Sequence, residues 1–164
     1  MKTVIFFRHT KSDWNTAFGH DHERPVNKRG KKAARRMGRF LAEIDQLPDR
    51  IVSSSATRAR MSVELAAEAG KWGDIPTEIT DDLYEASPTD VLSVLQSVSD
   101  GSDRLLVVGH EPTFSDVVGK LIGTGNIKMS TGAMARIDFD VEHWPDVAFG
   151  SGQLRWLVPP KILD

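Results

Sequence analysis

Short apolar runs mark the places where the chain is expected to form central strands. Three runs contain no polar residue: Val4 to Phe7, Ile51 to Val52 and Leu105 to Val108. Runs without alternation are typical of strands that are buried on both faces of a parallel sheet. The pattern therefore predicts three buried parallel strands.

Four other segments have apolar residues spaced as on one face of a helix. The apolar positions are Ala33, Met37, Phe40, Leu41 and Ile44; Ala59, Val63 and Ala67, ending near Gly70; Val91, Val94, Leu95 and Val98; and Phe114, Val117, Val118, Leu121 and Ile122. Ser87-Pro88 and Pro112 are helix start signals ahead of the last two segments. Strands and helices therefore alternate along the chain.

The end of the chain has a different pattern. Ala135, Ile137 and Phe139 alternate with polar residues, which predicts a strand with one wetter face. Leu154 to Val158 is expected to pair with it across the turn at 150–152. The alternation before it predicts an α/β fold with right-handed crossovers. We expect residues 1–164 to form one three-layer domain, with a mostly parallel central sheet, helices on both faces and a late antiparallel strand.

Composition narrows the classes of protein. The 164 residues, 40% of them hydrophobic, are enough for one domain with a real core. A formal charge of -2 gives no overall attraction to nucleic acid or to an anionic membrane. The absence of cysteine excludes disulfides, thiolate catalysis and cysteine-bound metals. The apolar stretch before Arg8 is too short for a signal peptide or a membrane span, so we expect a cytoplasmic protein.

Polar residues follow each of the three buried runs. They are Arg8-His9, Ser53-Ser54-Ser55 and Gly109-His110, with Arg58 just beyond the second set. The carboxyl ends of parallel strands meet at one crevice, so these side chains are expected to converge. A guanidinium matches two phosphate oxygens, and imidazole can attack phosphorus or donate a proton. The sequence therefore predicts a phosphate site that needs no metal or other cofactor.

The stretch His20-Asp21-His22-Glu23 contains metal-binding residue types. Histidines two apart in a loop point in divergent directions, and no third ligand has diagnostic spacing. We therefore interpret this stretch as a solvated loop at the rim of the pocket.

Four segments resemble the motifs of the histidine phosphatase superfamily, the phosphoglycerate-mutase-like group. Arg8 to Asn15 resembles the R-H-G-E-S-x-W-N signature, Ser53 to Arg60 the S-S-x-x-x-R-A segment, Leu83 to Glu85 the L-x-E segment, and Val108 to His110 the second-histidine segment. Thr10, Lys11 and Ser55 depart from the usual glycine, glutamate and proline. The short chain, Lys11-Ser12 and the stretch 21–30 are most similar to the SixA-type phosphohistidine phosphatases.

The resemblance implies a phosphoglycerate-mutase-like fold and a role for each matching residue. His9 would be the nucleophile that becomes phosphorylated, and Arg8, Arg58 and His110 would hold the phosphate. Asn15 would be a supporting phosphate contact. Glu85 would be the proton donor, with Asp13 and Asp21 as alternatives.

Several functions fit these residues. The leading hypothesis is a phosphatase that works through a phosphohistidine intermediate on His9, with a phosphohistidine protein as substrate. A small-molecule phosphomonoesterase or a phosphomutase is the alternative, although a mutase needs a closed site and little chain is left for a lid. A binding module for phosphorylated partners would not need the nucleophile. Lys11 and the arginines at 35, 36 and 39 are candidates for a basic rim facing an acidic partner. The sequence leaves the substrate, the pathway and the oligomeric state open.

Overall fold

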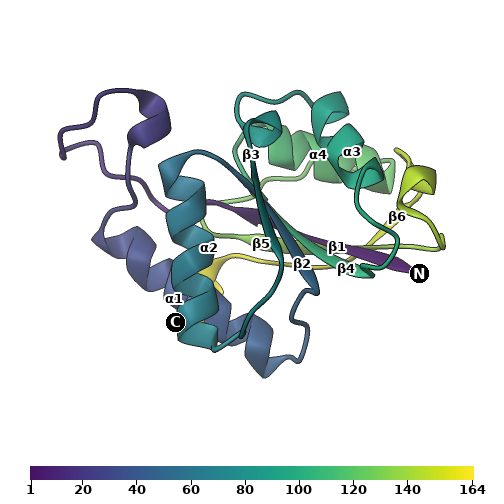
Figure 1. Cartoon of the computed structure of the whole chain (residues 1–164), viewed down its shortest axis with the longest axis horizontal. Helices are drawn as coiled ribbons and strands as arrows, with labels where there is room; N and C mark the ends of the chain where they lie inside the picture. The colour runs from purple at the N-terminus through teal and green to yellow at the C-terminus, as the bar shows by residue number, and fades with distance from the viewer.

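A mixed sheet of six strands forms the middle layer of the protein (Figure 1). The computed structural model describes all residues, 1–164. In the order β3-β2-β4-β1-β5-β6, the strands are β3 (Thr77–Thr80), β2 (Arg50–Ser54), β4 (Arg104–Gly109), β1 (Lys2–Arg8), β5 (Met134–Phe139) and β6 (Gly152–Val158). The first four are parallel, and β5 is antiparallel to both of its neighbours. The predicted α/β architecture is confirmed.

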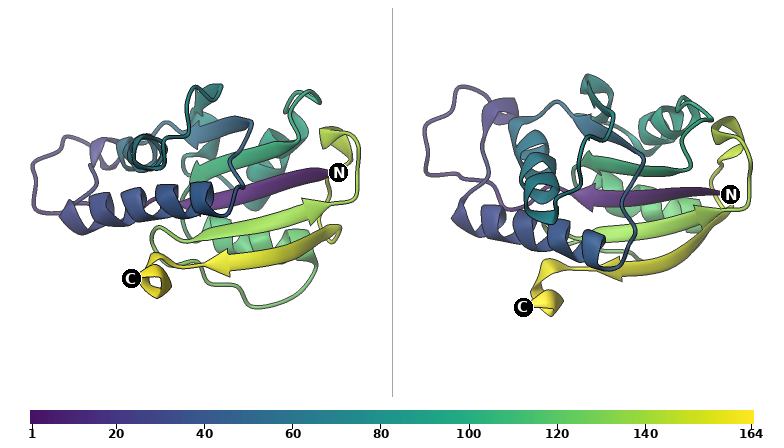
Figure 2. Two further views of the ribbon diagram at one scale, coloured as in Figure 1. Left: turned by 90° about the horizontal axis from the view of Figure 1, so that it is seen from below. Right: turned by 60° about the horizontal axis from the view of Figure 1, so that its bottom comes forward.

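Two pairs of helices cover the two faces of the sheet (Figure 2). One face is covered by α1 (Lys28–Glu43) and α2 (Thr57–Gly70), and the other by α3 (Pro88–Gln96) and α4 (Thr113–Ile122). Short 3-10 helices lie at η1 (Asp21–Glu23), η2 (Asp81–Leu83), η3 (Trp144–Asp146) and η4 (Pro160–Leu163). All four predicted helices are confirmed, although Ile44 and Val98 lie just past the ends of α1 and α3.

Strand β1 shows why its sequence does not alternate. Val4 and Phe6 pack into the core under α3 and α4, whereas Ile5 and Phe7 pack into the core under α1 and α2. Both sets of side chains are fully buried. The strand therefore needs apolar residues on both faces.

Local sequence features position the helices. The Asn27 side chain accepts a hydrogen bond from the Gly30 N–H at 2.8 Å and so caps α1. Ser87 and Asp90 form a capping box at the start of α3. A Cβ at Gly38 would lie 1.9 Å from the Ala66 carbonyl oxygen, so only glycine permits the close packing of α1 on α2.

The expectation of a wetter face on β5 is wrong. Asp138 is only 5% exposed. Its carboxylate accepts a hydrogen bond from the Thr3 hydroxyl at 2.8 Å and pairs with Arg136 Nε at 2.9 Å. Because β5 lies between β1 and β6, Asp138 is satisfied by Thr3 of the neighbouring strand β1 and by Arg136 of its own strand rather than by water. The edge strand β3 was not predicted, since Thr77–Thr80 is short and mostly exposed.

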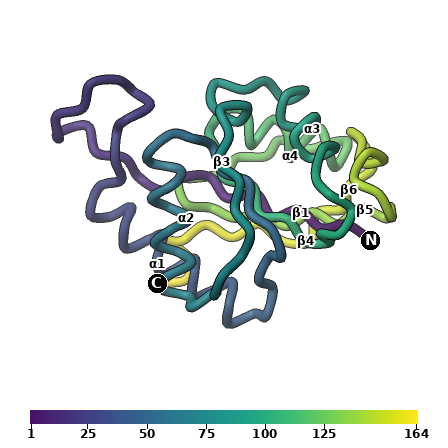
Figure 3. The backbone as a smooth tube through the Cα atoms, in the orientation of Figure 1, coloured from purple at the N-terminus to yellow at the C-terminus, as the bar shows by residue number.

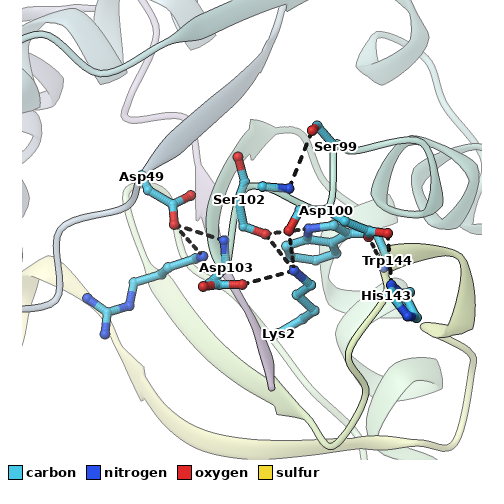
Figure 4. Close-up of polar contacts among 10 residues, drawn as sticks. Lys2, Asp49, Ser99, Asp100, Ser102, Asp103, His143 and Trp144 are labelled. Atoms are coloured by element: carbon cyan, nitrogen blue, oxygen red, sulfur yellow. Dashed lines mark hydrogen bonds and ion pairs between the residues drawn. The ribbon is translucent and has the colours of Figure 1, made fainter.

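The amino end of the sheet is closed by a polar network (Figure 4). Lys2 is 2% exposed, and its ammonium donates to the backbone oxygens of Asp100 and Ser102 and to the Asp103 carboxylate, each at 2.9 Å. Trp144 Nε1 donates to the Ser102 oxygen at 2.7 Å. All three ammonium donors thus have partners. At the opposite end of the sheet, the segment between β1 and α1 projects outward (Figure 3).

Candidate active site

A cleft of about 470 Å³ lies where the carboxyl ends of β1, β2 and β4 meet the projecting segment. Its lining residues are Arg8, His9, Lys11, Ser12, Trp14, Arg24, Asn27, Arg58, His110, Glu111 and Thr131. The structure thus brings together four of the predicted site residues, namely Arg8, His9, Arg58 and His110.

His9 follows directly after β1 and is only 8% exposed. Its Nδ1 lies 2.8 Å from the backbone oxygen of Thr10. A carbonyl oxygen can only accept a hydrogen bond, so Nδ1 carries the proton and Nε2 keeps a lone pair. Burial lowers the pKa of His9 to about 4, with the positive charges of Arg58 and Arg8 adding to the effect of burial. The imidazole is therefore neutral near pH 7 and is suited to act as a nucleophile.

Thr10, which stands where the superfamily motif usually has glycine, connects the end of β1 to α2 by hydrogen bonds. Its backbone N–H donates to Ser62 Oγ at 3.0 Å, and its hydroxyl lies 3.1 Å from the same oxygen. The Ser62 hydroxyl itself donates to the Arg58 backbone oxygen at 2.7 Å. Thr10 is not among the residues with positive φ, so a β-branched side chain is tolerated there. This contact links the element that carries His9 to the helix that carries Arg58.

His110 faces His9 across the cleft, with ring centroids 5.1 Å apart. Burial lowers its pKa to about 3, and the positive charges of its neighbours act in the same direction. Its Nε2 lies 2.8 Å from Ser54 Oγ, which also accepts a hydrogen bond from the Ala56 N–H. The Ser54 hydroxyl is able to donate to Nε2 of the neutral ring, and in that arrangement Nδ1 carries the ring proton.

The two predicted arginines are anchored at their terminal nitrogens. Arg8 Nη1 donates to the Met129 backbone oxygen at 2.8 Å. Arg58 donates to the backbone oxygen of Asp21 at 2.8 Å and to its carboxylate at 3.0 Å. The buried side-chain nitrogens without a hydrogen-bond partner are Arg8 Nε, Arg58 Nε, His110 Nδ1 and Arg104 Nε. Arg8, Arg58 and His110, which carry three of these four atoms, line the cleft. Their guanidinium and imidazole groups make the cleft suited to an anion.

Arg24 is a third arginine in the cleft that the sequence interpretation missed. It is 5% exposed, and its Nε donates to Ser12 Oγ at 2.9 Å. Its guanidinium lies 3.5 Å above the Trp14 ring. Arg24 stands in an irregular loop, so periodicity gives no signal for it. Only its place in the stretch that resembles SixA-type proteins pointed toward it.

Asp21 organises the rim of the cleft. Its carboxylate pairs with Arg24 at 2.5 Å and Arg58 at 3.0 Å, and it accepts a hydrogen bond from the Tyr84 hydroxyl at 2.8 Å. Burial acts to raise the pKa of Asp21, but the Tyr84 hydrogen bond and the two arginines outweigh it, so the pKa lies below its usual range. Asp21 is therefore ionised and holds both guanidinium groups in place.

Asn15 and Glu85 do not line the cleft. Asn15 is exposed, and its backbone N–H donates to the Asp13 carboxylate at 2.9 Å. Glu85 is exposed just before α3, with a left-handed φ of 52°. Glu111 is the carboxylate that lines the cleft, and both of its oxygens accept hydrogen bonds from Ser115, at 2.8 Å and 2.5 Å. Its signal in the sequence was only its position after His110.

The structure contains no group of three or more His, Cys, Asp or Glu side chains placed to hold a metal ion. In the 20–23 stretch, His22 Nε2 instead bonds to Ser55 Oγ at 2.8 Å. None of the helices is both long enough and apolar enough to span a bilayer.

A neutral histidine in a cleft that is also lined by three arginines and a second histidine is typical of a phosphoryl-transfer class of site. Residues 4–94 match the sequence model of the histidine phosphatase superfamily (branch 1), and the chain belongs to this superfamily. An uncharacterised protein of Mycobacterium tuberculosis is 34% identical to it over 94% of this chain and 99% of the relative. The 2,3-bisphosphoglycerate-dependent phosphoglycerate mutase of Mycobacterium leprae is 36% identical, but over 45% of this chain and 31% of the relative.

Solved structures share the fold over the full length. The protein histidine phosphatase SixA complexed with tungstate has a TM-score of 0.84 at 23% identity and covers 99% of both chains. A candidate phosphohistidine phosphatase SixA from Nakamurella multipartitia has a TM-score of 0.85 at 22% identity, over 97% of this chain and 96% of that one. At these identities the likeness is one of fold.

Proposed function

We propose that the protein is a phosphohistidine phosphatase that transfers the phosphoryl group of its substrate to Nε2 of His9 and then to water. The observation that carries this proposal is that Arg8, Arg58 and His110, each with a side-chain nitrogen that has no hydrogen-bond partner, line one cleft with His9, whose Nε2 keeps a lone pair. Cationic and neutral donors arranged in this way favour a dianionic phosphoryl group.

In the first step, Nε2 of His9 attacks phosphorus as the bond to the leaving group breaks. Arg8, Arg58 and the Nδ1–H of His110 donate to the equatorial oxygens, where charge accumulates in the transition state. The His9 ring becomes a phosphorylated imidazolium, and the Nδ1–H bond to Thr10 (2.8 Å) stabilises its positive charge. In the second step, water attacks phosphorus, the P–Nε2 bond breaks, and phosphate and neutral His9 are released.

The carboxylates at the cleft favour phosphohistidine over an alkyl phosphate as substrate. Glu111 accepts two hydrogen bonds from Ser115, and Asp21 is held by two arginines. Neither is free to donate a proton to a leaving group. An alkoxide needs such a donor, whereas the leaving imidazole of phosphohistidine can take its proton from water at its second ring nitrogen. For ester substrates, Glu85 stays the predicted proton donor.

The rim of the cleft favours a phosphoryl group carried on a protein. Trp14 is 69% exposed at the rim, and Lys11 beside it is also exposed. A projecting side chain can reach such a cleft, but a small metabolite would have few contacts beyond the phosphate. The fold is shared with SixA phosphohistidine phosphatases, one of them complexed with the tetrahedral oxyanion tungstate, and this likeness supports the same substrate class.

A comparison of substrates tests the proposal. The value of kcat/KM is measured for a protein that carries phosphohistidine and for 2- and 3-phosphoglycerate, each with and without a chelator. We expect the phosphohistidine protein to be preferred by at least about tenfold, and the chelator to have no effect. If a phosphoglycerate is preferred by that factor, the phosphomutase or phosphomonoesterase alternative replaces the proposal.

A further inference from the structure

We propose that one face of α1 is the docking surface for an acidic face of the protein substrate; this inference rests on the proposed function. The surface consists of Lys28, Lys32, Arg35 and Arg39, and we call it the basic stripe. All four side chains are exposed.

The spacing of the basic stripe places its members on one line along the helix. Steps of four, three and four residues return to the same face, and the stripe extends about 16 Å at a rise of 1.5 Å per residue. The opposite face of α1 is buried against α2 and the sheet through Ala34, Met37 and Leu41. The stripe is therefore turned to solvent along its whole length.

The basic stripe begins at the cleft. Lys11 lines the cleft, and its backbone oxygen accepts a hydrogen bond from the Asn27 N–H at 2.8 Å. Asn27 also lines the cleft and directly precedes Lys28, the first residue of α1. From this end, α1 runs along the sheet away from the projecting segment (Figure 2). Asn27 thus connects Lys11 at the cleft to the first residue of the basic stripe.

Helix stability does not account for these charges. Lys28 and Lys32, and likewise Arg35 and Arg39, are like-charged pairs four residues apart, which destabilise a helix. The first turn of α1 has no acidic residue, and Lys28 lies at the end where the helix dipole disfavours a cation. The ion pair found within α1 joins Arg36 to Glu43 at 3.9 Å and includes no member of the stripe. A negatively charged partner would relieve this repulsion.

The other rim of the cleft indicates that the partner is a protein. Tyr84, whose ring centroid lies 5.6 Å from that of His110, also lines a neighbouring groove of about 460 Å³. That groove contains Asp81, Asp82 and Asp90. A uniformly anionic surface, such as a lipid bilayer or a nucleic acid, would be repelled on this side while it was attracted by α1. A protein can present acidic residues toward α1 alone.

The test uses two peptides of equal length, each with one phosphohistidine, flanked on one side either by Asp and Glu or by Ser and Gln. The double variant Lys32→Gln, Arg35→Gln removes two charges of the stripe but no cleft residue. The matched control, Lys71→Gln, Lys120→Gln, removes two exposed charges from other elements. We measure kcat/KM for both peptides and for para-nitrophenyl phosphate, at low and high ionic strength.

We expect the wild-type protein to prefer the acidic peptide by about fivefold or more at low ionic strength, and to lose the preference at high ionic strength. The stripe variant should lose the preference, and the control should keep it. Both should retain wild-type activity on para-nitrophenyl phosphate. Equal preference in the stripe variant and the control would overturn the inference.

A binding measurement separates this inference from the proposed function. The same peptides are made with a non-hydrolysable phosphohistidine analogue, and their Kd is measured by fluorescence anisotropy. If neither phosphohistidine peptide is hydrolysed, the proposed function fails, while the Kd values of the two variants still decide the inference. In a parallel experiment, binding of the wild-type protein and of both variants to vesicles of phosphatidylserine and phosphatidylcholine is measured. Stripe-dependent binding to the vesicles, without a preference for the acidic peptide, would replace the protein partner by a membrane.

Discussion

Nδ1 of His9 lies 2.8 Å from the backbone oxygen of Thr10, the next residue in the chain. This single contact selects the tautomer in which Nε2 keeps its lone pair, as the proposed nucleophile requires. It also needs no side chain other than that of His9, so a substitution at position 10 preserves the hydrogen-bond acceptor. The replacement of the usual glycine by Thr10 is therefore compatible with catalysis.

His9→Ala is expected to lower kcat by at least about a thousandfold while the protein stays folded, because the nucleophile is lost. His20→Ala, a change of an exposed histidine outside the cleft, is the control. Wild-type protein quenched with base during turnover should carry acid-labile phosphate on His9, detected by mass spectrometry. Unreduced activity of His9→Ala would end the assignment of the nucleophile.

Ser54→Ala tests which ring nitrogen of His110 carries the proton. Without the Ser54 hydroxyl, Nε2 of His110 loses its donor and the ring can bind its proton at either nitrogen, so Nδ1–H is no longer held toward phosphate. We expect kcat to fall by about tenfold or more. Ser53 is the matched control, since it is equally buried but its hydroxyl donates to the Ser54 backbone oxygen at 3.0 Å. A similar loss of kcat in Ser53→Ala would mean that packing, not the proton, explains the effect.

The main features of the fold were predictable from the sequence. The runs at 4–7 and 105–108 could be recognised because both faces of a central strand must be apolar. Asp138 was misjudged because one of its partners, Thr3, is brought beside it by the pairing of β1 with β5, which a single sequence does not reveal. The edge strand β3 has neither alternation nor an apolar run.

The convergence of side chains was predictable where they follow strands. Arg8, His9 and His110 were expected to meet because parallel strands end at a common edge, and all three line the cleft. Arg24 was missed because it comes from an irregular loop, and its burial depends on Trp14 and Asp21. The roles predicted for Asn15 and Glu85 came from resemblance alone, and both residues lie outside the cleft.

Arg58→Ala should impair catalysis far more than Arg60→Ala. Arg58 is buried in the cleft with an unpaired Nε, whereas Arg60 is half-buried outside it and donates to the Ser55 backbone oxygen at 3.0 Å. Losing a charge-assisted contact that strengthens in the transition state should reduce kcat/KM by about a hundredfold or more. Steady-state kinetics on the phosphohistidine protein provide the comparison. Equal losses in the two variants would place the phosphate elsewhere.

The free energy of unfolding should fall as pH is lowered from about 6.5 toward about 4. In the folded protein the pKa values of His9 and His110 are about 4 and about 3, whereas the pKa of a histidine in the unfolded chain is about 6.5. The unfolded chain therefore binds more protons within this window, and each histidine contributes a slope of up to about 1.4 kcal/mol per pH unit. Urea unfolding of wild-type protein and of the double variant His9→Gln, His110→Gln measures the difference. Parallel pH profiles of the two proteins would contradict the burial of neutral histidines.

Glu85→Gln distinguishes the two kinds of leaving group. Because Glu85 is exposed and lies outside the cleft, and a leaving imidazole can be protonated by water, we expect kcat/KM for the phosphohistidine protein to change by less than about threefold. If Glu85 donates the proton to poorer leaving groups, the same variant should lose about tenfold or more on an alkyl phosphate. Glu43→Gln, a change of an exposed glutamate at the far end of α1, is the control. A large loss on the phosphohistidine protein would show that the segment before α3 closes over the cleft when substrate binds, and that an acid is needed even for imidazole.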